Sequence, residues 1–118
     1  MLINLTNHPS ARWSEEQKAA AGVYGEIVDM PFPQIDEAGD ENYIATLADE
    51  YLQKILLIAE RENVIVHLMG ELTFCFALLC RLKKHCITCV ASTTKRIVCE
   101  EEPGKKIVTF QFVKFREY

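Results

Sequence analysis

The run VIVHLM, residues 64 to 69, is almost entirely apolar and ends at Gly70. An uninterrupted apolar run of this length is typical of a central parallel strand that is covered on both faces. A helical pattern stands on each side of it. Before it, residues 41–61 carry apolar side chains at the spacing of a core-facing helix, with Asp40 as the N-cap. After it, residues 72–82 are apolar almost all round and end in basic residues, which suit a helix C-terminus.

The same alternation extends to both ends of the chain. A short helix is predicted from a capping serine, Ser14, to about Ala21. The other apolar stretches predict five more strands, at residues 2–6, 26–30, 87–91, 96–101 and 106–114. A Pro-Gly turn at residues 102–105 joins the last two. The order β-α-β-α-β-α-β-β-β predicts a single α/β domain over residues 1–118, a Rossmann-like three-layer sandwich with a mainly parallel sheet and a C-terminal antiparallel hairpin.

Charge and composition exclude several classes of function. Thirteen Lys and Arg against seventeen Asp and Glu give a net charge of −4, which argues against binding of long nucleic acids. A small anionic ligand needs only a local basic pocket. The longest stretch without Asp, Glu, Lys or Arg has eleven residues, too few for a membrane span, so we expect no membrane partner. Five cysteines outside any disulfide framework indicate free thiols and a cytoplasmic protein.

Ligands of an open parallel sheet bind at the carboxyl ends of its strands. In the predicted order, three polar loops follow strands at that edge: residues 7–13, 69–74 and 92–96. Their candidate ligand-binding residues are Asn7, His8, Ser10 and Arg12 in the first, Met69, Gly70, Glu71 and Thr73 in the second, and Ser92, Thr93, Thr94, Lys95 and Arg96 in the third.

These residue types favour recognition of a phosphate or a nucleotide. Hydroxyls donate to phosphate oxygens, and Lys and Arg neutralise them. Gly70 allows close backbone approach at a helix start, where free N–H groups attract anions. His8 is a candidate proton carrier near neutral pH. Two alternatives stay open: residues 92–96 are only a polar turn into the hairpin, and Glu71 is either a general base or a carboxylate that favours the helix dipole.

Other patterns indicate structural roles. His85, Cys86, Cys89 and Cys99 suggest zinc, but residues three apart on a predicted strand point to opposite faces. We therefore interpret these cysteines as structural thiols and expect no metal and no cofactor. His67 lies within a strand and is more typical of a hydrogen-bonded core histidine than of a ligand-binding one.

The helix over residues 72–82 has more apolar surface than one side of a small sheet can cover. Either the hairpin or a second subunit must cover the rest. We expect a homodimer.

Three segments of the chain resemble the small CARF-related accessory proteins of type III CRISPR loci. They are the opening strand followed by Asn7-His8, the segment HLMGELTF at residues 67–74 with Ala77-Leu78 and a basic helix end, and CVASTTKR at residues 89–96. The resemblance implies a homodimeric, CARF-like Rossmann fold that binds cyclic oligoadenylate, the second messenger of type III interference. Several members cleave this ring and are called ring nucleases, whereas others only bind it.

The resemblance leads us to expect a metal-independent ring nuclease that cleaves cyclic tetra-adenylate by attack of a ribose 2′-hydroxyl and so switches antiviral signalling off. Lys95 and Arg96 are expected to hold the scissile phosphate, with His8 as proton carrier. Further contacts are assigned to Ser10, Arg12, Gly70, Thr73, Thr93 and Thr94. One alternative is a non-catalytic receptor or sponge for the same messenger. Another is a Rossmann-like interaction module without a nucleotide ligand.

Overall fold

A five-stranded sheet forms the centre of the computed structural model, which describes residues 1–118. The sheet has the order β2-β1-β3-β4-β5. Its strands are β1 (Leu2–Leu5), β2 (Ile27–Asp29), β3 (Ile65–Leu68), β4 (Thr88–Glu102) and β5 (Lys105–Glu117). β1 to β4 pair in parallel, and β5 runs antiparallel to β4. The predicted mainly parallel sheet with an antiparallel C-terminal pair is confirmed.

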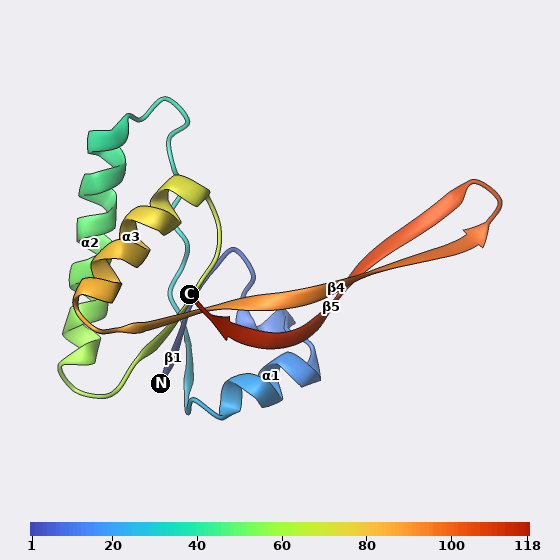
Figure 1. The fold of residues 1–118 in the computed structure, drawn as a ribbon, viewed down its shortest axis with the longest axis horizontal. Coiled ribbons are helices and arrows are strands. Elements are labelled where there is room, and N and C mark those ends of the chain that lie inside the picture. The colour runs from blue at the N-terminus through green and yellow to red at the C-terminus, as the bar shows by residue number, and fades with distance from the viewer.

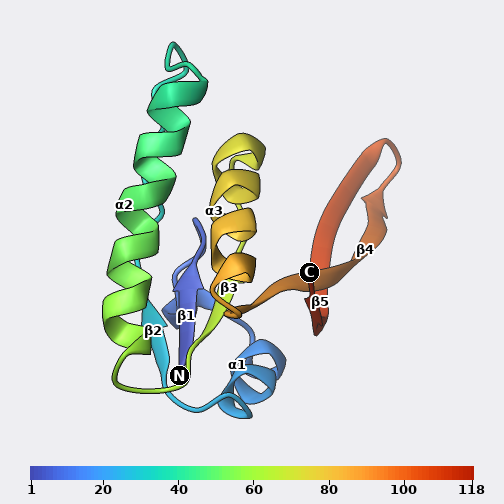
Figure 2. The same ribbon diagram turned by 60° about the vertical axis from the view of Figure 1, so that its left-hand side comes forward.

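Helices cover both faces of this sheet (Figures 1 and 2). α2 (Glu41–Ala59) and α3 (Leu72–Lys84) lie side by side on one face, and α1 (Glu15–Gly22) lies on the other. Ile3 and Leu5 of β1 point into the cluster formed with α2 and α3, whereas Leu2 packs with Trp13 and Ala21 on the α1 side. Alternate side chains of one strand thus pack into two hydrophobic cores, one on each face of the sheet, as a three-layer α/β arrangement requires. No helix is both long and apolar enough to cross a membrane.

Two predicted N-caps set the helix starts. The Ser14 hydroxyl accepts a hydrogen bond from the backbone N–H of Gln17, and an Asp40 carboxylate oxygen lies 2.9 Å from the Tyr43 nitrogen. Each bond satisfies an N–H group that the first turn leaves without a helical partner. The C-terminal ends are less well predicted from sequence. α2 stops at Ala59, two residues early, and α3 continues two residues further, to Lys84.

Aromatic packing positions the turn between β3 and α3. Phe74 is fully buried and meets the rings of Phe32 and Tyr51 edge to face, with centroids 5.3 and 5.4 Å apart. A Cβ atom added to Gly70 would lie 2.3 Å from the Phe32 ring. Glycine at this position therefore leaves room for the Phe32 ring, whether or not a ligand also approaches.

The expectation of a loop at residues 92–96 is wrong. β4 runs without interruption from Thr88 to Glu102, so the predicted strands at 87–91 and 96–101 are one strand. Ser92 and Arg96 pair with Phe115 and Phe110 of β5, with one irregularity between Thr93 and Thr94. The segment contains no Gly or Pro, and threonine favours strands. Its polarity reflects exposure and not a turn.

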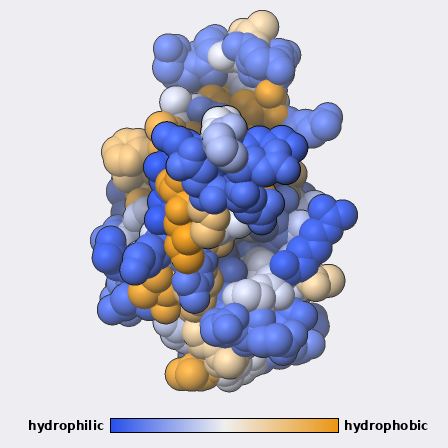
Figure 3. All heavy atoms as spheres, turned by 90° about the vertical axis from the view of Figure 1, so that its right-hand side faces the viewer, coloured by the Kyte–Doolittle hydropathy of each residue, from blue (hydrophilic) through white to orange (hydrophobic).

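The distal part of β4 and β5, residues 94–102 and 105–113, projects from the body as a two-stranded arm (Figure 1). The predicted turn is confirmed at Pro103-Gly104, where Gly104 has a φ of +87°. Large apolar side chains on the arm are exposed: Val98, Ile107, Val108, Phe110 and Val113. Figure 3, which views the molecule from the side of the arm, shows a largely hydrophilic surface with scattered hydrophobic patches. Leu72 and Phe76 of α3 are also 82% and 69% exposed, so the hairpin does not cover this helix.

Candidate functional site

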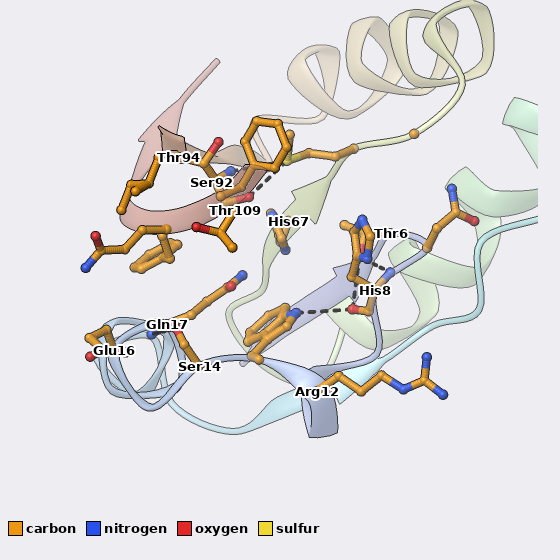
Figure 4. A pocket seen from close by; sticks show the side chains of 18 residues that line it. Thr6, His8, Arg12, Ser14, Glu16, Gln17, His67, Ser92, Thr94 and Thr109 are labelled. Carbon is orange, nitrogen blue, oxygen red and sulfur yellow. Dashed lines mark hydrogen bonds between the residues drawn. The ribbon is translucent and has the colours of Figure 1, made fainter. Parts of the chain in front are cut away.

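A cleft of about 980 Å³ opens where β1 and β3 end (Figure 4). The start of α1 forms one wall, and the β4–β5 pair forms the opposite one. This is the carboxyl edge of the parallel strands, where the sheet topology predicts ligands. Its volume lies near the top of the roughly 300–1,000 Å³ range of ligand pockets.

Three side chains hold the loop after β1 through the backbone carbonyl of His8. This oxygen lies 2.9 Å from Asn4 Nδ2 and 3.1 Å from Trp13 Nε1. It also lies 3.2 Å from the Thr6 hydroxyl, and Figure 4 shows Thr6 and His8 next to each other. The His8 backbone N–H donates to the Thr6 hydroxyl. The His8 side chain, by contrast, is exposed and lines the cleft. The loop thus fixes the backbone and leaves the imidazole free to meet a ligand.

Ser10 anchors this loop to β2. Its backbone N–H and its hydroxyl donate to the two carboxylate oxygens of Asp29, at 3.1 and 2.9 Å. Burial raises the pKa of Asp29, but hydrogen bonds from Asn4 and Ser10 more than offset it, so the pKa lies below its usual value. Ser10 does not line the cleft. It supports the loop that carries His8 and Arg12.

The contacts of Glu71 favour the second of its two alternatives, a carboxylate that stabilises the start of the helix. Its carboxylate accepts hydrogen bonds from the backbone N–H groups of Thr73 and Phe74, at 2.9 and 2.8 Å, and from the Thr73 hydroxyl. The bonds from Phe74 and Thr73 lower the pKa of Glu71. Glu71 is the N-cap of α3, and the Thr73 hydroxyl is engaged with it. Neither residue lines the cleft.

A sulfur contact connects the end of β3 to β4. Met69 Sδ lies 3.3 Å from the Ser92 backbone nitrogen and 3.1 Å from its hydroxyl oxygen. Both Met69 and Ser92 line the cleft. The neighbouring Thr93 hydroxyl instead bonds with the backbone of Lys114 in β5.

The structure brings together about half of the residues predicted for the site. Those that line the cleft are Asn7, His8, Arg12, Met69, Gly70, Ser92 and Thr94. Those that do not are Ser10, Glu71, Thr73, Thr93, Lys95 and Arg96. In particular, His8, Thr73 and Lys95 do not converge on one pocket. Lys95 and Arg96 are exposed on β4, because the segment that carries them is a strand and not a loop over the sheet edge.

The comparison with protein families covers nearly the whole chain. The model of the uncharacterized protein MJ1673 family matches residues 1–116. The chain belongs to the MJ1673 family. No curated protein and no solved structure matches it. The description of the MJ1673 family carries no activity.

The charge around the cleft is modest. Arg12 is the one Arg or Lys among the lining residues, and Glu16 is the one carboxylate. His8 and His67 add two imidazoles. Apolar and aromatic surface comes from Trp13 and from residues of the arm, whose lining side chains include Phe110 and Phe112. The arrangement suits a ligand with flat apolar groups as well as negative charge.

Sequence reasoning missed several cleft residues in this MJ1673-family chain. His67 is buried and bonds to Asn4 through Nδ1, as expected of a core histidine, but its Nε2 has no hydrogen-bond partner and the residue also lines the cleft. The others are Thr6, Trp13, Ser14, Glu16, Gln17, Ile97, Thr109, Phe110, Gln111 and Phe112. Most of these lie on α1 or on the arm, which only the tertiary fold brings to the carboxyl edge.

The cysteines lie apart from this site. All five are free, and burial raises the pKa of both Cys75 and Cys89 to about 11, so these two thiols stay protonated. None of the five lines the cleft. No group of three or more potential metal ligands gathers anywhere in the chain.

Proposed function

We propose that this protein binds cyclic oligoadenylate in the cleft at the carboxyl edge of the sheet and cleaves it. One observation carries the proposal: a single cleft combines an arginine, an exposed histidine, hydroxyl groups and aromatic side chains. Arg12 suits a phosphate. Ser92, Thr94 and Thr109 offer hydroxyls to ribose and phosphate, and aromatic side chains suit adenine bases by stacking.

The resemblance to CARF-related accessory proteins supports the same ligand. The segments that carry it include Asn7-His8 and Met69-Gly70, and these four residues line the cleft. The resemblance also covers Ser92 and Thr94, on the opposite wall. About half of the residues that suggested this class of ligand from sequence therefore line one cleft.

The proposed cleavage uses a nucleophile that belongs to the substrate. A ribose 2′-oxygen forms a bond to the adjacent phosphorus, and the bond from phosphorus to the 5′-oxygen breaks. The products are a 2′,3′-cyclic phosphate end and a 5′-hydroxyl. Arg12 stabilises the charge that develops on the phosphate, and His8 supplies the proton that the leaving 5′-oxygen takes up. The rigid loop after β1 holds both groups in place.

Incubation of the wild-type protein with cyclic tetra-adenylate in the presence of EDTA tests this function. Chromatography of the mixture should show loss of the ring and appearance of linear products. An intact ring at high enzyme excess, together with saturable binding in calorimetry, would show that the protein is a receptor and not a nuclease. No binding of any cyclic oligoadenylate would refute the whole proposal.

A non-catalytic receptor or sponge is the second candidate, and one observation favours it. Lys95 and Arg96, the cations expected at the scissile phosphate, lie outside the cleft. The cleft then offers one arginine per chain for charge stabilisation. Binding of a ring requires less of this stabilisation than cleavage does.

Arg12→Ala is expected to weaken binding of cyclic tetra-adenylate about tenfold, because a charge-assisted hydrogen bond contributes roughly 1.5–3 kcal/mol and Arg12 is exposed to water. Calorimetry with both proteins measures the ratio of dissociation constants. Arg61→Ala is the matched control, since Arg61 is exposed just beyond α2 and does not line the cleft. Equal affinity of the Arg12 and Arg61 variants would remove Arg12 from the site.

We also propose that the protein is a homodimer with α3 in its interface. Leu72 and Phe76 expose large apolar side chains on this helix, and the hairpin leaves them uncovered. A two-fold axis presents the same loops twice, which matches a ring of adenylates with even internal symmetry. A dimer would also supply two Arg12 side chains for one ring.

Phe76→Asp is expected to convert the dimer to a monomer, because an unpaired charge at the centre of an apolar interface costs several kcal/mol. Light scattering across a concentration series measures the mass. Val23→Asp is the control, since Val23 is 85% exposed at the end of α1 and outside α3. A wild-type protein that is monomeric at all concentrations contradicts the proposal.

A further inference from the structure

His67 combines two properties that rarely occur together. Its side chain is only 2% exposed, in the middle of the central strand β3, and yet it forms part of the cleft wall. The Trp13 ring lies edge to face against it, and Figure 4 shows it on the side of the cleft that also carries Thr109. A buried imidazole needs partners for both ring nitrogens, so its hydrogen bonds can be followed one by one.

The Nδ1 atom of His67 is a donor. It lies 3.0 Å from Asn4 Oδ1. The orientation of the Asn4 amide follows from its other end, because Nδ2 lies 2.8 Å from a carboxylate oxygen of Asp29 and 2.9 Å from the His8 carbonyl oxygen. A carbonyl oxygen and the oxygen of an ionised carboxylate can accept hydrogen bonds but cannot donate them. Asn4 therefore presents its oxygen to His67, and Nδ1 carries the hydrogen.

The other nitrogen, Nε2, then carries a bare lone pair. It is the one buried side-chain nitrogen or oxygen in the protein without a hydrogen-bond partner. Aromatic rings surround the imidazole, with the centroids of Trp13 and Phe115 at 5.5 and 5.1 Å. Burial and then the charge of His8 lower the pKa of His67 to about 4, so the ring stays neutral near pH 7. An unmet buried acceptor destabilises the folded protein, and a ligand that donates to it recovers the lost free energy.

A ligand that satisfies Nε2 must bring an O–H or N–H group. Phosphate diesters only accept, so the phosphates of a cyclic oligoadenylate are excluded as partners. The ribose 2′-hydroxyl is next to the phosphate-bearing 3′ carbon. His8 and His67 both line the cleft, so a phosphate bound at His8 brings this hydroxyl into the cleft that His67 faces.

We propose that Nε2 of His67 accepts the hydrogen of a ribose 2′-hydroxyl of the bound cyclic oligoadenylate, an inference that rests on the proposed function. Nε2 is covered in the absence of ligand, so a movement of side chains in the cleft wall admits the hydroxyl. When the ring is cut, Nε2 takes the 2′-proton as the oxygen attacks phosphorus. The 5′-oxygen takes its proton from His8. His67 then releases its proton to water, and His8 takes up a proton from water, which restores both imidazoles.

The experiment compares the affinities of two proteins, the wild type and one His67 variant, for two ligands. His67→Asn retains an N–H near the position of Nδ1, so it keeps the bond to Asn4 and removes the acceptor at Nε2. Each protein is titrated with cyclic tetra-adenylate and with its fully 2′-deoxy analogue, using the first seconds after rapid mixing, before any cleavage. We expect the wild type to bind the deoxy ring about tenfold more weakly and the variant to bind both rings alike.

Each outcome decides a different point. A variant that discriminates against the deoxy ring as strongly as the wild type overturns the role of His67 and leaves the proposed function in place. A wild type that binds neither ring overturns both. If the variant does not fold, nitrogen-15 spectra of the wild type test the same point. Cyclic tetra-adenylate should shift the Nε2 resonance toward its hydrogen-bonded value, and the 2′-deoxy analogue should not. Equal shifts with both ligands would refute the assignment.

Discussion

Replacement of His8 by alanine is expected to slow cleavage of cyclic tetra-adenylate by about 10²–10⁴-fold, the usual contribution of one positioned proton carrier. The loop itself should survive the change, because Asn4, Thr6 and Trp13 hold it through the His8 carbonyl and not through the imidazole. The lost rate therefore reports on the side chain. Single-turnover kinetics with chromatography of the products measures it, and calorimetry checks that the variant still binds the ring.

Lys95→Ala is the matched control for His8→Ala. Lys95 was expected at the scissile phosphate, but it is exposed on β4 and outside the cleft. We expect its removal to change the rate by no more than about twofold, as for most surface substitutions. If Lys95→Ala abolishes cleavage while His8→Ala does not, the reacting phosphate lies along the arm and the site has been placed wrongly.

Much of the fold could be predicted from the sequence because its signals are local. The apolar run that forms β3, the caps at Ser14 and Asp40, and the Pro-Gly turn each act over a few residues. The continuity of β4 is different. Whether a polar stretch such as residues 92–96 turns or continues depends on the partner strand, and β5 pairs with it along the whole segment.

The sequence does contain a signal for the hydrogen bond between Asn4 and His67. Asn4 and His67 are the polar residues within two otherwise apolar strands, and the register of β1 and β3 places them directly opposite each other. Two polar side chains at matched positions in a buried sheet indicate a hydrogen-bonded pair. The pair alone does not reveal the cleft, since its other wall comes from the arm, more than 25 residues further along the chain.

Lowering the pH from 7 to 4 is expected to reduce the free energy of unfolding by about 3 kcal/mol through His67 alone. Burial and the nearby charge of His8 lower the pKa of His67 from 6.5 to about 4. In the unfolded chain the imidazole takes up a proton as the pH falls through 6.5, whereas the folded protein keeps it neutral until about pH 4. The unfolded state binds more protons in this window, so stability is full above pH 6.5 and is lost toward pH 4.

Urea unfolding at a series of pH values between 8 and 4 measures this loss. His67→Asn is the control, because it lacks the titrating group and retains the bond to Asn4. Asp29, whose pKa is also lowered, titrates in both proteins and cancels in the difference. If both proteins lose stability with the same slope between pH 6.5 and 4, His67 takes up its proton at the same pH in the folded and the unfolded state, and burial does not lower its pKa.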